Sequence, residues 1–194
     1  MTRIEEILKK SNALLNGHFL YTSGRHGEQY MQCAKVLQYP GYTEELAAKV
    51  AESFAGETVD IVIAPAVGGI IWGYELARAL RAKSIFVERE DGEMTLRRGF
   101  EIPKNARVVV AEDVYTTGGT IREVIEIVKT HGATLVGVGV IVDRTGGKMD
   151  LNTKAVAAYA TEIISHPPEN CPLCKQGLPI TKPGSREVFP PVSG

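Results

Sequence analysis

The sequence predicts an α/β protein, built on a parallel sheet with helices on both faces. From residue 59 onward, short apolar runs of strand length alternate with longer segments whose apolar residues recur at helical spacing. The apolar runs are nearly continuous, which is typical of parallel strands buried on both faces. The chain has 194 residues, enough to bury such a core in one domain.

A helix and two strands are expected before this alternation begins. Thr2 and Glu5 form a capping box, and the apolar residues that follow continue at roughly helical spacing as far as Gly17. Residues 19–27 have the composition of a strand and turn, and residues 29–33 alternate as a strand does. The next expected element is an amphipathic helix, which covers residues 43–54.

The alternation itself supplies five expected strands, over residues 61–64, 84–87, 107–111, 135–142 and 155–161. Helices are expected from Gly68 through Leu80 and from Thr120 to His131, with Gly132 as a C-terminal cap. Residues 88–99 are charged and nearly devoid of apolar side chains, so we expect an irregular, mobile segment there. Most of the ten prolines follow residue 166, which predicts an extended tail.

Charge and composition exclude several classes of function. The chain has 22 basic and 23 acidic residues, so it has no overall basic field and we expect no nucleic-acid partner. The longest apolar stretch, residues 135–142, is too short to cross a bilayer. Three cysteines, an odd number, argue against a disulfide framework, and the first residues do not have the pattern of a signal peptide. We therefore expect a cytoplasmic protein with no membrane partner.

The most informative segment runs from Val108 to Thr120 and reads VVVAEDVYTTGGT. A short apolar strand is followed by two carboxylates, a Thr/Gly loop and the start of a helix. Ligands of parallel sheets bind beyond the carboxyl ends of the strands, and a loop of this kind at a helix N-terminus favours phosphate. The segment lacks the patterns of a Walker loop and of a dinucleotide fingerprint. Glu112 and Asp113 indicate a ligand with hydroxyl groups as well as a phosphate, such as ribose 5-phosphate. The alternative is a plain strand–turn–helix with exposed acids.

This order of residues resembles the signature of the type I phosphoribosyltransferases. The segment FLYTSGRH at residues 19–26, followed by Tyr30, is similar to the N-terminal hood of orotate phosphoribosyltransferases, and the spacing to Asp143 and Arg144 fits that group. The resemblance covers about residues 1–165. It implies one phosphoribosyltransferase domain with a small N-terminal hood formed largely from residues 1–40, followed by a proline-rich tail over residues 166–194.

The resemblance implies an activity and a set of partners. The chain is expected to transfer the 5-phosphoribosyl group from phosphoribosyl diphosphate to orotate, giving orotidine 5-phosphate and pyrophosphate in UMP biosynthesis. Mg²⁺ is the implied cofactor, held without a direct protein ligand, and a homodimer is the implied assembly. Two alternatives stay open: a purine phosphoribosyltransferase, and a regulator that keeps the fold but senses a nucleotide without catalysis.

The resemblance also implies roles for individual residues. The implied catalytic set is Glu112, Asp113, Arg89, Arg97 and Arg98. The implied phosphoribosyl diphosphate contacts are Glu112, Asp113, Val114, Tyr115, Thr116, Thr117, Gly118, Gly119 and Thr120, together with Val67 and Gly68. The implied orotate contacts are Thr116, Arg144, Tyr30 and Met31, the last two through their backbone.

Three positions depart from the family pattern. Many relatives carry lysines and a histidine in the mobile loop that corresponds to residues 89–99, and this chain has none there. A glycine of the loop at residues 66–69 stands where many relatives have a lysine, and Thr22 replaces another basic contact. The arginines of the loop are the expected substitutes for the missing charges.

The tail contains Cys171 and Cys174, which form a Cys-x-x-Cys pair with His166 five residues earlier. These three side chains are candidate zinc ligands, with a second copy of the chain as the source of any missing ligand. The alternatives are a redox pair or two small packed residues. Of the remaining residues, Cys33 and Trp72 are expected in the core and His18 and His131 on the surface, and the position of His26 stays open.

Overall fold

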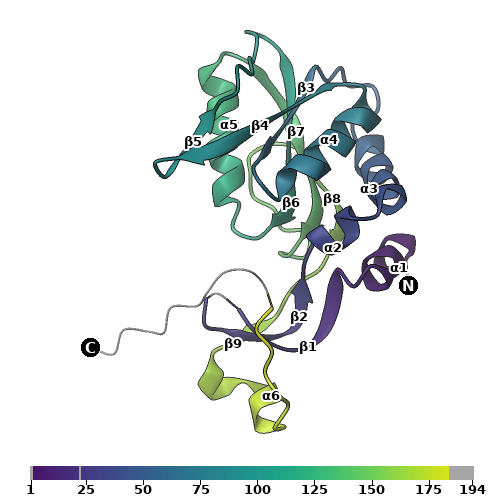
Figure 1. Ribbon diagram of the computed structural model, residues 1–194, viewed down its shortest axis with the longest axis vertical. Coiled ribbons are helices and arrows are strands. Elements are labelled where there is room, and N and C mark those ends of the chain that lie inside the picture. Colours follow the sequence, from purple (N-terminus) through teal and green to yellow (C-terminus); the bar gives the residue numbers. More distant parts are fainter. Residues whose placement is uncertain (1, 22, 184–194) are drawn as a thin grey trace.

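The computed structural model describes residues 2–21 and 23–183. Its main domain contains a six-stranded sheet of order β5-β4-β3-β6-β7-β8 (Figure 1), in which every neighbouring pair is parallel except β4 and β5. The strands are β3 (Ile61–Pro65), β4 (Lys83–Glu90), β5 (Glu93–Leu96), β6 (Arg107–Tyr115), β7 (Thr134–Asp143) and β8 (Ala155–Ala160). The predicted α/β class is confirmed.

Helices cover both faces of this sheet. On one face lie α2 (Ala34–Leu37), α3 (Pro40–Glu52) and α4 (Gly69–Leu80), and on the other lies α5 (Gly119–Thr130). Successive side chains of a strand point to opposite faces of the sheet, so the core consists of two clusters, one on each face. In β3, Val62 and Ala64 pack in the cluster that holds α3 and α4, whereas Ile61 and Ile63 pack in the cluster that holds α5.

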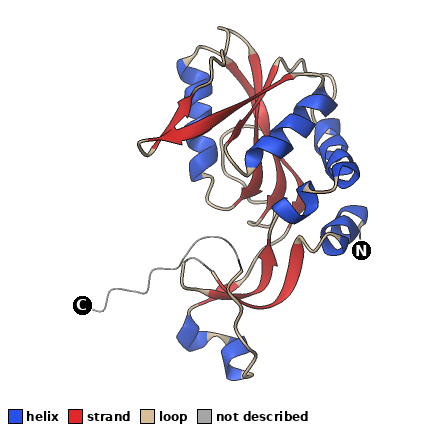
Figure 2. Ribbon diagram, in the orientation of Figure 1, coloured by secondary structure: helices blue, strands red, loops and turns tan. Residues whose placement is uncertain are grey.

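A second, smaller sheet lies below the main domain (Figure 2) and consists of β1 (Leu14–Leu20), β2 (His26–Met31) and β9 (Ser165–His166). We call these three antiparallel strands the hood sheet. The chain beyond β9 forms a 3₁₀ turn η1 (Pro168–Asn170) and a short helix α6 (Pro172–Lys175) against the hood sheet. The first helix, α1 (Arg3–Lys10), instead inserts Ile7 and Leu8 into the main core.

The first helix is shorter than the prediction. It ends at Lys10, Asn12 adopts a left-handed φ of 55°, and β1 begins at Leu14. The later apolar residues that suggested a longer helix therefore belong to a strand, in which Leu14 is buried. The capping box itself is present, since the Glu5 N–H donates to the Thr2 hydroxyl over 3.2 Å.

Two further segments differ from the prediction. Residues 88–99 were expected to be irregular, but β4 and β5 form an antiparallel hairpin there, with Val87 paired to Leu96 and Arg89 to Met94. Met94 and Leu96 are partly buried against the core, and these two side chains fix the register of an otherwise charged hairpin. In the tail, the backbone of Thr181 exchanges hydrogen bonds with β1, so the tail returns to the hood sheet between its short helices and residue 183.

Several single-residue predictions are confirmed and one is wrong. Trp72 is fully buried, with its indole N–H donating to the Gly139 carbonyl over 2.9 Å, and Cys33 is also buried. His131 lies exposed at the C-terminal end of α5. His18 is buried, not on the surface, because its ring lies against His26 and the tail. In the described residues no helix has the length and apolar character needed to cross a membrane.

Candidate active site

Three loops of the predicted site meet at the carboxyl edge of the sheet. The register pairs Ile63 of β3 with Val110 of β6, and Tyr115 of β6 with Asp143 of β7. The loops that follow β3, β6 and β7 therefore leave the sheet side by side. This edge is where parallel sheets bind their ligands.

The loop after β6 encloses a hollow of about 260 Å³. Its lining consists of Glu112, Val114, Thr116, Thr117, Gly118, Gly119, Thr120, Ile121 and Glu123. The helix α5 begins at Gly119, so the positive end of its dipole faces the hollow. Three threonine hydroxyls, loop N–H groups and a helix N-terminus give this hollow the chemistry of a phosphate site.

Gly118 determines the shape of this loop. Its φ is +75°, in the left-handed region, and a Cβ there would lie 2.6 Å from the buried ring of Tyr115. Arg122, one turn into α5, holds the loop from the other side by donating to the carbonyls of Thr117 over 2.6 Å and Asp150 over 2.7 Å. The loop is therefore fixed before any ligand arrives.

Glu112 and Asp113 are the last charged residues of β6, and the loop after β3 lies against them. A Cβ on Gly68 would lie 3.1 Å from Asp113 Oδ2, and one on Gly69 would lie 3.4 Å from Glu112 Oε1. Burial, and next the charge of Asp113, raise the pKa of Glu112 to about 8. Two carboxyl groups at this edge are suited to accept hydrogen bonds from a diol.

Arg144 follows β7 and has an incomplete set of partners. Its backbone N–H donates to the Tyr115 carbonyl over 3.0 Å, which places it beside the end of β6. Its guanidinium carbon lies 5.3 Å from the centroid of the Tyr21 ring. Within the described residues its Nε is buried and donates to no acceptor. A buried, unpaired guanidinium donor is what a carboxylate ligand would satisfy.

The hood sheet places β2 near the carboxylate loop. The Cys33 thiol, just beyond β2, donates to the Asp113 carbonyl over 3.6 Å. Met31 is buried, with its side chain in the main core, and the contact of its backbone with orotate stays a prediction. Tyr30 is half-buried and its ring lies 5.7 Å from that of Phe19. Thr22 lies outside the described residues.

The three arginines assigned to catalysis all lie on the β4–β5 hairpin or just beyond it, and each forms an ion pair. Arg89 pairs with Glu123 of α5 over 2.8 Å, which brings it to the rim of the phosphate hollow. Arg97 pairs with Glu90 over 3.1 Å, and Arg98 forks onto Glu88 over 2.7 and 2.8 Å. Their proposed role at pyrophosphate stays a prediction.

Tyr21, Arg122 and Cys33 contact the site but were not assigned to it from the sequence. Tyr21 lies inside the hood motif, directly before its polar residues 22–26, and this place was the signal that could have singled it out. Arg122 lies on the first turn of α5, a position from which a basic side chain can reach back to the loop. No local pattern marks Cys33, because its contact with Asp113 joins residues that are 80 apart in sequence.

Comparisons with known proteins agree with this geometry. The family profile described as phosphoribosyl transferase domain matches residues 42–166. An orotate phosphoribosyltransferase of Pelotomaculum thermopropionicum is 53% identical over 190 residues, which is 97% of this chain and 100% of that protein. One of Chlorobium phaeobacteroides is 51% identical over 93% of this chain and 94% of that protein.

Solved structures resemble most of the fold. The crystal structure of orotate phosphoribosyltransferase from Aeropyrum pernix has a TM-score of 0.70 at 28% identity, over 81% of this chain and 93% of that one. An adenine phosphoribosyltransferase from Thermoanaerobacter pseudethanolicus has a TM-score of 0.60 at 19% identity. The match covers 69% of this chain and 89% of that chain, and shows a shared fold. By its matching domain and its near full-length relatives, this chain belongs to the phosphoribosyltransferase family, in the group of the orotate phosphoribosyltransferases.

Proposed function

We propose that this chain transfers the 5-phosphoribosyl group of phosphoribosyl diphosphate to orotate, giving orotidine 5-phosphate and pyrophosphate for pyrimidine biosynthesis. The bond from ribose C1 to pyrophosphate breaks, the bond from C1 to N1 of orotate forms, and N1 gives up its proton. The observation that carries the proposal is the meeting, at adjacent strand ends, of the carboxylate–Thr/Gly loop and the unpaired Nε of Arg144.

The sugar side of the site has one group for each part of the ribose phosphate. The hollow at Thr116–Thr120 holds the 5-phosphate, and the Glu112 and Asp113 carboxyl groups accept from the 2- and 3-hydroxyls. Positive charge grows on the sugar in the transition state, so an ionised carboxylate beside it stabilises that state. The loop at Val67 and Gly68 supplies backbone N–H groups to the pyrophosphate.

The base side is provided by Arg144. A planar guanidinium forms paired hydrogen bonds to a carboxylate, and orotate differs from uracil by that carboxylate. The Tyr21 ring behind the guanidinium limits its movement and so fixes the direction of the fork. This side chain therefore orients N1 toward C1 of the sugar.

The residues of this edge fit Mg²⁺, because carboxylates and hydroxyls are hard oxygen donors of the kind that it accepts. Glu112, Asp113 and Thr116 would hold it through water, with no direct protein ligand. When bound, the ion neutralises the charge that develops on the departing pyrophosphate. The arginines of the hairpin contribute further positive charge to this neutralisation, and the hairpin excludes water when it lies over the site.

We further propose that the chain acts as a homodimer. Val67, Ile71 and Tyr74 recur at intervals of four and three residues, on the loop before α4 and along one face of this helix. Their exposed fractions are 83%, 55% and 65%, high for large apolar side chains. A second copy of the chain would cover this surface, which lies beside the pyrophosphate loop.

The test of the proposed reaction is direct. Purified protein is given orotate, phosphoribosyl diphosphate and Mg²⁺, and the loss of orotate absorbance is followed. Turnover is expected with orotate, and none with adenine or hypoxanthine in place of orotate. Turnover of a purine alone would assign the chain to the purine branch, and absence of turnover with every base would favour the regulator.

A further inference from the structure

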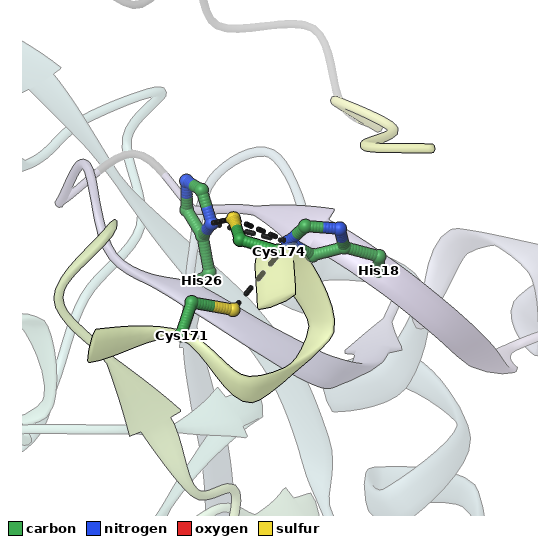
Figure 3. A group of neighbouring side chains, drawn as sticks. All are labelled: His18, His26, Cys171 and Cys174. Carbon is green, nitrogen blue, oxygen red and sulfur yellow. Dashed lines mark hydrogen bonds between the residues drawn. The ribbon is translucent and has the colours of Figure 1, made fainter. Parts of the chain in front are cut away.

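Four side chains that the proposed reaction does not use meet at the far end of the hood sheet. His18 comes from β1, His26 from β2, and Cys171 and Cys174 from the turn at α6 (Figure 3). Each offers one ligand atom, and these atoms all lie within 4.8 Å of one another. His18, His26 and Cys171 are buried, while Cys174 lies at the exposed edge of the group.

The distances match those of a tetrahedral site. His18 Nε2 lies 3.1 Å from His26 Nδ1, 3.6 Å from the Cys171 sulfur and 3.7 Å from the Cys174 sulfur, and the latter lies 3.2 Å from His26 Nδ1. Zinc with bonds of about 2.0 Å to nitrogen and 2.3 Å to sulfur separates its ligand atoms by about 3.3–3.8 Å. These four separations are close to those of such a site, and the other two, from the Cys171 sulfur to His26 Nδ1 and to the Cys174 sulfur, are at most 4.8 Å, so small side-chain movements would complete the tetrahedron.

The tautomer of His18 is set for a cation. Its Nδ1 lies 2.8 Å from the Leu178 carbonyl oxygen, which can only accept, so Nδ1 carries the proton and Nε2 presents a lone pair to the cluster. A backbone carbonyl on the outer nitrogen is the usual second contact of a metal-bound histidine. Without a metal, this lone pair can accept a hydrogen bond from only one of the donors that face it, and the remaining donors have no acceptor there. A cation satisfies all four ligands together.

The lobe around this cluster has few buried apolar side chains to stabilise it. Of the two apolar clusters of the described residues, one reaches the hood sheet, through Leu14 and Met31, and neither includes a residue of η1 or α6. The buried apolar side chains here are few, chiefly Phe19 and Leu173. Small lobes of this kind depend on a metal or a disulfide, because they cannot bury enough apolar surface. A metal at the cluster would attach α6 to β1 and β2.

We propose that His18, His26, Cys171 and Cys174 bind one structural Zn²⁺ per chain. Two nitrogen and two sulfur donors in a tetrahedron select zinc over magnesium, which prefers oxygen. Each thiol gives its proton to solvent on binding, and the two thiolates balance the charge of the ion. The ligands all come from one chain, which corrects two expectations: a second copy is not needed, and His166 is not in the cluster, since it faces the neighbouring pocket with Leu173.

The first experiment measures metal in the full chain, purified without a metal-binding tag. We expect about one zinc ion per chain by elemental analysis. If the preparation has lost zinc, the reduced protein is titrated with Zn²⁺ and with Co²⁺, whose visible spectrum distinguishes a tetrahedral thiolate site. The proposal is overturned if the reduced chain binds neither ion, or if bound cobalt gives no thiolate charge-transfer band.

Variants then test the ligand set. Cys171→Ser with Cys174→Ser, and separately His26→Ala, should abolish the cobalt spectrum, while His166→Ala serves as the matched control and should keep it. Removal of zinc from the wild type should speed proteolytic cleavage in the tail at least about tenfold, and addition of zinc should reverse this. Because the wild type is compared with and without metal, this result does not depend on the folding of a variant. Equal metal uptake by the double serine variant and the wild type would refute the assignment.

Discussion

The guanidinium carbon of Arg144 lies 5.3 Å from the centroid of the Tyr21 ring, so one residue that follows β7 and one that follows β1 share the base side of the site. The hydroxyl of Tyr21 donates to the Gln29 carbonyl of β2 over 2.5 Å, which anchors the ring to the hood sheet. The hood sheet therefore positions Arg144 through an aromatic surface, without an ion pair.

The first prediction concerns Arg144→Ala. Loss of a paired, charge-assisted contact typically costs about 1.5–3 kcal/mol, so the KM for orotate should rise about ten- to a hundredfold. The KM for phosphoribosyl diphosphate should change much less, because that substrate contacts the β6 loop. Steady-state kinetics with each substrate varied in turn checks this split.

Tyr21→Leu tests the positioning role of the ring. It keeps an apolar surface but removes the aromatic face, and should raise the KM for orotate by a smaller factor than Arg144→Ala does. An equal rise in the KM for both substrates in either variant would mean that the two residues support the general structure and do not specifically position orotate.

The second prediction concerns Asp113→Asn, which removes a carboxylate charge beside the ribose at almost constant shape. Turnover should fall by about tens- to hundreds-fold, because the charge stabilises a cationic sugar more in the transition state than in the ground state. The melting temperature should change little. The measurement is kcat together with thermal unfolding.

Asp60→Asn is the matched control for this change. Asp60 accepts the Arg107 N–H over 2.7 Å at the start of β6, the end opposite to the catalytic loop. Its replacement should leave kcat unchanged. If Asp113→Asn turned over as fast as the wild type, Asp113 would not be the group that meets the diol.

The third prediction concerns Gly118→Ala. A Cβ at Gly118 would meet the ring of Tyr115 at 2.6 Å and would occupy a left-handed conformation, so the loop must shift or the ring must move. We expect a loss of about 1–3 kcal/mol in the free energy of unfolding and a higher KM for phosphoribosyl diphosphate.

Gly56→Ala separates these two effects. Gly56 also has a left-handed φ, of +84°, but nothing lies within 4 Å of its Cβ position. This control should show the backbone cost alone, with both KM values unchanged. A normal KM in Gly118→Ala would mean that the loop adapts without cost to phosphate binding.

The fourth prediction follows from the raised pKa of Glu112. Burial and the neighbouring Asp113 raise it to about 8, whereas the carboxyl of an unfolded chain ionises near 4.5. Below pH 4.5 the group is protonated in both states, and between pH 4.5 and 8 only the unfolded state releases its proton. The contribution of Glu112 to stability is therefore present at low pH and is lost as pH rises to about 8.

Glu112→Gln removes this titration. Its free energy of unfolding should exceed that of the wild type by an amount that grows with pH over this window and then levels off. A shift of this size, at about 1.4 kcal/mol per pKa unit, corresponds to a growth of about 5 kcal/mol. Urea unfolding of both proteins at several pH values measures the difference. A difference that stays constant from pH 5 to pH 8 would contradict the raised pKa.

Much of the main domain could be predicted because its strands follow simple rules. In β3 every residue is buried, and in β7 every residue from Gly137 on, which matches the continuous apolar runs that predicted them. The prediction ended β6 at Ala111 because charged residues follow, yet the strand continues to Tyr115 through pairing with β7. Backbone pairing with a neighbour extends a strand into polar residues, and a single segment of sequence does not show it.

The metal cluster shows why other features could not be predicted. Cys171 and Cys174 are visible as a pair in the sequence, but His18 is 153 residues from Cys171, and no spacing rule joins them. The nearby His166 was the natural choice for a third ligand. The return of the tail to the hood sheet, through the backbone of Thr181 and β1, determines which histidines the cysteines meet.

The last prediction concerns the β4–β5 hairpin and the proposed homodimer. Arg98 and Arg97 are exposed and paired with Glu88 and Glu90 of the same hairpin. Exposed ion pairs contribute at most about 1 kcal/mol, so a pyrophosphate can draw these arginines away at small cost. The hairpin extends away from the body of the main domain (Figure 1), and in the proposed homodimer we expect it to reach the site of the second copy. Arg98→Ala should then lower kcat more than it raises either KM, while Arg107→Ala, whose arginine lies at the opposite edge, should leave kcat unchanged.

Mixing two inactive variants tests whether the hairpin acts across the dimer. When Arg98→Ala and Asp113→Asn subunits exchange, each mixed dimer has one site in which both residues are intact, provided that Arg98 serves the neighbouring site. Random pairing makes about half of the dimers mixed, so recovery of up to about a quarter of the wild-type activity is expected. Subunit exchange is checked independently with a size-tagged copy of one variant. If the tagged dimers form and the mixture stays inactive, Arg98 does not act on the site of the partner subunit, because only action across the dimer can restore a complete site.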